Sequence, residues 1–441
     1  MSSVTTVDEV IEREPFGRLQ LMLVALISGA VIVDGFDIQA IAFIGPVLLK
    51  EWGLTRADLG PVITAALIGM VIGTPLGGRL GDRLGRRSAL ILSTAFFGLT
   101  TLVAALAADV NQLAVMRFIS GLGFGALLPN ATALVAEWMP SRFRSQAISL
   151  MIVGVPIGGM LGAAASPWLV ENFGWRSCFV VGGTLGLLMA AALVVALPES
   201  LRFITKRSPN RKALVKLLNR AFGSGRFSES DAFYISELPR TSWSEIFVPQ
   251  RLRATVGLSL AFFANLLAYY AFVSWMPTLL TSMGVQFEVA LRGAFFFNLW
   301  GLPGALAGAA LVWWRGSRFG LLVLLTSGIL MGGILGFIIN SPPIEPLSLM
   351  VALSIAGASV AGVQAGLYAL SAAAYATHCR STGVGFVSGI GRLGPVVSGL
   401  GGAFVLALSE GHTMFFICIV MTLLAAASGV LIVDRHTRPA T

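Results

Sequence analysis

Two acidic residues, Asp34 and Asp37, interrupt the otherwise apolar stretch from Gly29 to Leu48. In a helix, residues three positions apart lie on one face. At the centre of a membrane-spanning helix each acid costs about 2.5–3.5 kcal/mol on insertion scales, so such residues face a polar cavity rather than lipid. Two close carboxylates also repel each other, which favours a proton on one of them. We interpret the pair as a proton site with Asp34 the preferred carrier; the alternative is that Asp37 only caps or anchors the helix.

Two arginines in apolar surroundings are candidates for binding negative charge. Arg117 begins the stretch RFISGLGFG, whose alternating glycines allow a neighbouring helix to approach closely. It could neutralise an acid of the first helix; the alternative is an interfacial arginine whose charge points to water. Arg392, in GIGRLGP, lies deep in an apolar segment, and its planar guanidinium suits a carboxylate. Arg392 is therefore the candidate for holding an anionic substrate, the alternative being a structural pair with a helix acid.

Polar and aromatic residues of other apolar segments are candidate walls of the same site. They are Gln39, Asn130, Asn265, Tyr269, Asn298, Gln364 and Tyr368. Aromatic faces would suit an aromatic substrate, but aromatic side chains are also common in cores and at membrane interfaces. Both interpretations stay open for this group.

The motif GGRLGDRLGRR at 77–87 is a candidate conformational gate. Its glycines permit a tight turn, its aspartate could accept hydrogen bonds from the amides at a helix N-terminus, and its arginines could bridge neighbouring helices. The residues concerned are Gly78, Asp82, Arg83, Gly85 and Arg86. Such a charged turn between two helices would hold one conformation closed.

The composition requires a membrane as the solvent for these residues. Of 441 residues, 56% are hydrophobic and 12% charged, whereas an ordinary soluble domain has about 25% charged residues. The three cysteines and three histidines form no ligand cluster, and no nucleophile–base pair is evident, so we expect neither an enzyme nor a metal or cofactor site.

Twelve apolar segments of roughly 20 to 30 residues are each long enough to cross a bilayer. Their expected bounds are 17–49, 58–80, 88–108, 111–137, 143–170, 174–197, 252–282, 286–314, 318–340, 345–377, 381–408 and 411–433. We therefore predict an all-α membrane protein of two six-helix bundles. The expected parts are an N-terminal tail (1–16), a first bundle (17–197), a linker (198–251), a second bundle (252–433) and a C-terminal tail (434–441).

The net charge is +9, and the distribution of the basic residues indicates membrane topology and does not suggest nucleic-acid binding. One set of connections, with both termini and the linker, holds most of the lysines and arginines. The opposite set holds Lys50, Arg56, Arg176 and Arg292. This asymmetry predicts that both termini and the linker are cytoplasmic.

The two halves also resemble each other. DRLG at 82–85 and SRFG at 317–320 follow equivalent segments, and RSQAISLMIVGVPIGG from Arg144 matches RSTGVGFVSGIGRLGP from Arg380 at almost the same separation. The repeat predicts duplicated bundles with a shared central site.

These motifs together resemble a known family. GRLGDRLGRR, RFISGLGFG and PESLRF look like signatures of the major facilitator superfamily, and DGFD, WMPTLL and RSTGVGFVSGIGRLGP look like its aromatic acid:proton symporter branch. The resemblance spans essentially the whole chain. It implies proton-driven uptake of an aromatic carboxylate across the bacterial inner (plasma) membrane, with transport roles for Asp34, Asp37, Asp82 and Arg392.

The expected partners are thus protons, a small aromatic carboxylate and membrane lipid. We expect the chain to be a monomer and to need no cofactor. An efflux antiporter and a symporter of non-aromatic organic acids, both on the same fold, remain as alternatives. Two positions depart from the family pattern. Ser317 stands where an aspartate is often found, so the second half should lack one cytoplasmic latch, and Thr377–His378 replaces a common proline.

Overall fold

The spanning segments form the predicted helices. The computed structural model describes residues 4–14, 16–207, 211–223, 225–228, 232–234, 243–341, 343–376, 379–408 and 410–437. Within these ranges, twelve helices are long and apolar enough to cross a membrane, which confirms the predicted fold class. They are α2 (Arg18–Glu51), α3 (Arg56–Leu84), α4 (Arg86–Ala104), α5 (Val110–Trp138), α6 with α7 (Ser141–Ile152, Gly154–Phe173), α8 (Arg176–Ala196), α11 (Pro249–Ser282), α12 (Phe287–Arg315), α13 (Ser317–Ile339), α14 (Pro346–Ala374), α15 with α16 (Arg380–Gly391, Leu393–Leu406) and α17 (Gly411–Ile432).

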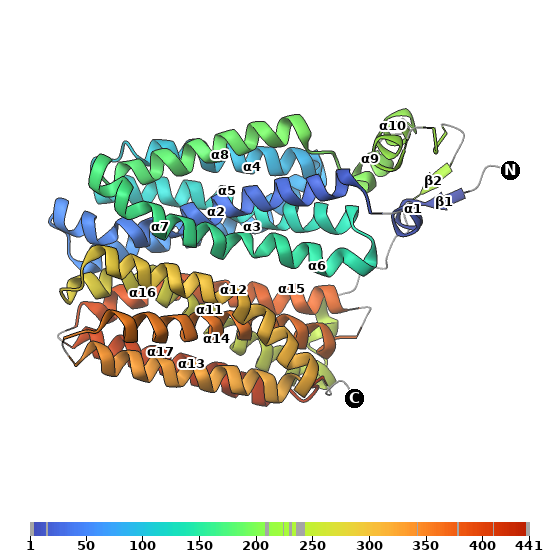
Figure 1. The fold of residues 1–441 in the computed structure, drawn as a ribbon. Coiled ribbons are helices and arrows are strands. Elements are labelled where there is room, and N and C mark those ends of the chain that lie inside the picture. Colours follow the sequence, from blue (N-terminus) through green and yellow to red (C-terminus); the bar gives the residue numbers. More distant parts are fainter. Residues whose placement is uncertain are drawn as a thin grey trace.

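Helices α2–α8 form one bundle and α11–α17 form the other. Figure 1 shows the first bundle above the second. The longer matched motifs, which begin at Arg144 and Arg380, lie in the two interrupted spanning helices. The first breaks at Val153, between α6 and α7, and the second at Arg392, between α15 and α16.

Equivalent helix pairs pack tightly in both bundles: α3 on α5 in the first, and α12 on α14 in the second. On α3, glycines recur every fourth residue at Gly69, Gly73 and Gly77, and a Cβ at any of them would collide with α5. On α12, Gly304 and Gly308 meet α14 in the same way. Small residues at this spacing allow two backbones to touch, which is how helices associate in lipid.

The N-terminal tail and the linker form a small layer at one end of the bundles. It contains β1 (Val4–Thr6), paired in parallel with β2 (Ala232–Tyr234), together with α1 (Val7–Arg13), α9 (Leu201–Arg207) and α10 (Arg211–Phe222). The 3-10 helix η1 (Trp243–Ile246), at the end of the linker, packs on α11 and α15 of the second bundle. Arg202 Nη2 donates to both carboxylate oxygens of Asp8 at 2.9 Å, and its Nε donates to Oδ1 at 3.2 Å. Arg226 pairs with Glu14. Figure 1 places this layer and both chain ends on one side. We call that side the linker end and the opposite side the far end.

The bundles meet through the far-end parts of their helices. Helix α16, the far-end half of its interrupted pair, packs on α3, and α7 packs on α12. Gly60 lies against Ala403, and Arg56 Nη1 donates to the carbonyl of Leu406 at 3.2 Å. These contacts hold the far end of the two bundles together.

We predict that Gly73→Val destabilises the protein, because its Cβ would lie 2.8 Å from the Cα of Leu122 and force α3 away from α5. Overpacking of this kind costs about 1–3 kcal/mol. Thermal unfolding of the purified variant should show a lower midpoint than Gly333→Val, a matched control on α13 with open space around its glycine. Equal midpoints would contradict the role of this contact.

Candidate functional site

Asp37 and Arg117 form a buried ion pair in the first bundle. Arg117 Nη1 lies 3.1 Å from Asp37 Oδ2, and Arg117 Nη2 donates to the backbone carbonyl of Asp37 at 3.0 Å. Thr101 of α4 donates to the same carboxylate oxygen at 3.0 Å. Both charged side chains are 1% exposed or less. The arginine also lies between the rings of Phe124 and Phe179, which holds its guanidinium in place.

Asp34 lies one helical turn from Asp37, and no described residue forms an ion pair with it. It is 3% exposed, and its Oδ1 has no hydrogen-bond partner among the described residues. Oδ1 of Asp37 and Nε of Arg117 are also buried and have no hydrogen-bond partner among the described residues. One guanidinium can neutralise one of two carboxylates. The second carboxylate is costly to bury as an anion, and uptake of a proton removes that cost. This arrangement can therefore bind a proton.

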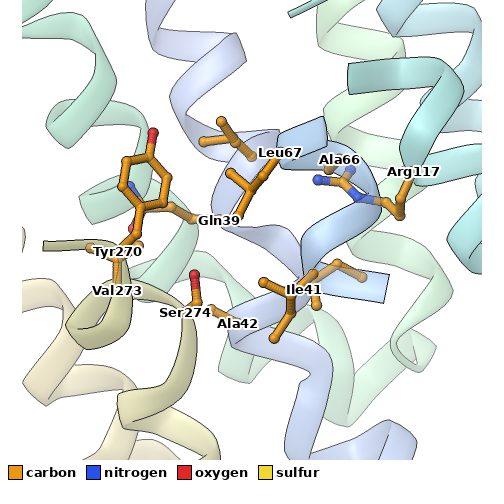
Figure 2. A pocket seen from close by; sticks show the side chains of 11 residues that line it. Gln39, Ile41, Ala42, Ala66, Leu67, Arg117, Tyr270, Val273 and Ser274 are labelled. Carbon is orange, nitrogen blue, oxygen red and sulfur yellow. The ribbon is translucent and has the colours of Figure 1, made fainter. Parts of the chain in front are cut away.

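A small cavity adjoins the ion pair and reaches both bundles. Its volume of about 20 Å³ holds one water molecule. Figure 2 shows Arg117 on one side of the lining and Tyr270 of α11 on the other. Tyr270 also lies within electrostatic range of Asp34 and Arg392. The cavity therefore lies between Arg117, the ion-pair partner of Asp37, and Tyr270 of the second bundle.

Arg392 lies at the break between α15 and α16, partly buried and directed at the first bundle. Its Nη1 donates to Oγ1 of Thr74 on α3 at 2.5 Å. It has no ion-pair partner among the described residues, and it lies within electrostatic range of Tyr270 and Tyr368. A cation in this position can bind a carboxylate that enters between the bundles.

Gln39 and Asn298 join the two bundles through a pair of side-chain amides. Asn298 Nδ2 donates to Gln39 Oε1 at 3.1 Å, and Gln39 Nε2 lies 3.5 Å from Asn298 Oδ1. Both residues are buried, and Gln39 also lines the cavity beside Arg117. The structure thus places these two predicted site residues together, on facing helices.

The other predicted wall residues lie in different surroundings. Asn265 donates to Gln364 Oε1 at 2.8 Å, so these two amides join α11 to α14 within the second bundle. Tyr269 packs against Phe297 at 5.7 Å, and the half-exposed Tyr368 packs against Phe262 at 5.0 Å.

Asn130 lies apart from this group. It is fully buried and donates to the carbonyls of Gly77 and Ala126 at 2.8 Å each. Its side chain joins α5 to α3, so we assign it to helix packing and do not retain it as a wall of the site.

The gate motif is more helical than its glycines suggested. Helix α3 continues to Leu84, and the turn is made by Gly85 alone, whose φ of +99° favours glycine. Asp82 does not cap a helix: its carboxylate accepts from Arg86 at 2.5 Å. Arg86 also donates to the carbonyl of Gly78 at 3.4 Å, and Arg83 lies on the exposed last turn of α3.

Two glutamates at this turn were not predicted as functional. Glu199 of the PESLRF motif accepts from the backbone amides of Arg87 at 2.9 Å and of Ser200 at 2.8 Å. Glu137 lies 3.8 Å from Arg86 and accepts from Ser200. The acid at the end of an apolar helix was a usable signal for Glu137. Together these acids connect the linker to the turn between α3 and α4.

The second-half turn, where Ser317 replaces the aspartate, is bound by the C-terminal tail. The backbone amide of Ser317 donates to Thr437 Oγ1 at 2.9 Å, and its hydroxyl lies 3.1 Å from His436 Nδ1. Burial lowers the pKa of His436. The other departure, Thr377–His378, lies outside the described residues.

We predict that Arg117→Gln destabilises the protein strongly, because it leaves two buried carboxylates without a countercharge. Removing one partner of a buried pair costs about 3–5 kcal/mol. The thermal midpoint of purified Arg117→Gln should fall well below that of Arg176→Gln, whose pair with Glu51 is almost half exposed. Asp37→Asn in the Arg117→Gln background should restore part of the loss; identical midpoints for both single variants would contradict the assignment.

Comparison with known proteins agrees with the fold and the motifs. Residues 27–347 match the model of the Major Facilitator Superfamily. The 4-hydroxybenzoate transporter PcaK of Acinetobacter baylyi is 34% identical over 429 residues, which cover 96% of this chain and 93% of that protein. The gallate transporter of Pseudomonas putida is 34% identical over 436 residues, covering 98% and 95%.

A solved structure supports the same fold. The xylose transporter XylE from E. coli, in a partially occluded inward open conformation, superposes with a TM-score of 0.76 over 96% of this chain and 99% of its own, at 16% identity. The family resemblance of the sequence motifs is confirmed, and so is the expectation that the chain is no enzyme. The chain is a multi-pass membrane protein that belongs to the major facilitator superfamily, and its relatives at 34% identity are aromatic acid transporters.

Proposed function

We propose that this protein is a symporter that takes up an aromatic carboxylate together with a proton by alternating access. The observation that carries the proposal is the pair of incomplete charge sites near the contact of the bundles. Asp34 is a buried acid without a countercharge, and Arg392 is a cation without an acid partner among the described residues. The first can take a proton and the second can take a carboxylate.

The proton site consists of Asp34, Asp37 and Arg117. Arg117 stays with Asp37, to which it donates twice, so Asp34 is the acid that gains and loses the proton. Protonation removes the one uncompensated charge of the group. The cavity that Arg117 shares with Tyr270 leads from this group toward the second bundle.

The substrate site centres on Arg392. Its guanidinium would hold the carboxylate, and the rings of Tyr269, Tyr270 and Tyr368 would face the aromatic ring. The amides of the Gln39–Asn298 and Asn265–Gln364 pairs would offer donors and acceptors to ring hydroxyls. The names of the 4-hydroxybenzoate and gallate transporters support a hydroxylated benzoate as the substrate.

The two bundles, 17–197 and 252–433, would rock about this site while the 198–251 linker spans them. We place the linker end, with the tails 1–16 and 434–441, in the cytoplasm because its loops carry most of the basic residues. The gate residues Gly78, Asp82, Arg83, Gly85 and Arg86 lie at that end, on the turn that the linker contacts through Glu199. We propose a monomer in the bacterial inner membrane without a cofactor.

Transport by proteoliposomes tests the proposal. Counterflow of benzoate, 4-hydroxybenzoate, gallate, cinnamate and muconate first identifies the acid that the wild type exchanges. Wild-type protein should then accumulate that acid uphill when the outside is acidic. Asp34→Asn should exchange it but not accumulate it, because the variant cannot carry the proton.

Asp109→Asn is the matched control, since Asp109 is an exposed helix cap that asparagine replaces well. Uphill accumulation by Asp34→Asn at the control rate would contradict proton coupling through this residue. Preference for muconate would indicate a transporter of non-aromatic acids. Accumulation only when the inside is acidic would indicate an efflux antiporter.

A further inference from the structure

A hydrogen bond across the bundles occupies the proposed substrate arginine. We propose that Thr74 holds Arg392 in the empty transporter and competes with the substrate carboxylate for it. The inference rests on the proposed role of Arg392 and adds to that role a residue of the opposite bundle that sets substrate affinity.

The hydroxyl of Thr74 is arranged to accept from this arginine. It lies on α3 and donates its own proton to the carbonyl of Met70 at 2.8 Å. Its oxygen therefore faces Arg392 as an acceptor, and the 2.5 Å separation is that of a close contact. A serine could make both bonds, whereas a valine of the same shape could make neither.

Arg392 keeps further donors available in this arrangement. Nε of Arg117 is buried without a hydrogen-bond partner. Among the described residues, no side-chain nitrogen of Arg392 is both buried and without a partner. A carboxylate can therefore reach the guanidinium. As an anion with two oxygens it binds more strongly than a neutral hydroxyl, so it can displace Thr74.

Displacement would also act on the contact between the bundles. Thr74 belongs to the face of α3 that packs on α16, where Gly60 lies against Ala403 and Thr64 against Gly399. Arg392 is the residue at which α15 and α16 meet. Exchange of Thr74 for substrate removes one bond between α3 and this hinge, which links binding to bundle movement. A bond that exists only in the empty state also lowers the apparent affinity for the substrate.

The test is equilibrium binding to purified full-length protein, measured by calorimetry with the acid of the counterflow panel that binds the wild type. Thr74→Val should bind this acid more tightly than the wild type, on the order of threefold to tenfold, since the competing bond to a charged group is lost. Thr74→Ser should bind like the wild type. Thr132→Val is the matched control, because Thr132 makes the same backbone bond to the residue four positions earlier and has no arginine partner among the described residues.

Each result separates this inference from the proposed function. Unchanged or weaker binding by Thr74→Val, with Arg392→Gln still abolishing binding, would overturn the role of Thr74 alone. If Arg392→Gln binds the acid as tightly as the wild type, the substrate role of Arg392 is overturned, and this inference with it. Binding of none of the acids to the wild type would contradict both. Tighter binding by Thr74→Val but not by Thr132→Val supports the competition.

Discussion

One guanidinium, that of Arg117, lies with two carboxylates in the buried centre of the first bundle and forms an ion pair with one of them. It donates to the side chain and backbone of Asp37 and leaves Asp34 without a partner among the described residues. The low polarity of this region makes an uncompensated charge expensive, so the protonation of Asp34 and the arrangement of the surrounding helices are linked. A proton can therefore influence structure at this position more than at any exposed acid.

The packing of the helices determines where this influence can act. Glycines bring α3 against α5, on which Arg117 lies, and α3 also carries the face that meets α16. Tyr270 lies within electrostatic range of Asp34 and Arg392, and Gln39 connects the cavity beside Arg117 to Asn298. Tyr270 and Gln39 therefore lie between the proposed proton group, the proposed substrate arginine and the contact of the bundles. We infer that binding at one of them alters the others through these intervening residues.

The sequence predicted the twelve helices and the charged residues of the site for one physical reason. Charges are rare in apolar helices, so Asp34, Arg117 and Arg392 stood out without any structure. Thr74 and Thr101 carried no such signal, because threonines are common in helices and their partners lie far away in the sequence. Asn130 had the right chemistry but faces a neighbouring helix, and Asp82 pairs with Arg86 because α3 continues through the expected loop. Composition indicates which residues are costly, whereas the direction of each side chain depends on packing.

Simultaneous recording of acid entry and proton entry tests the central claim most directly. Proteoliposomes held at zero voltage would contain a pH-sensitive dye and receive a labelled acid of the counterflow panel, with protein-free liposomes correcting for diffusion of the neutral acid. The account predicts that protons enter with the acid in wild-type protein, and that Asp34→Asn exchanges acid without moving protons. Acid entry through the wild type with no accompanying proton entry would contradict it.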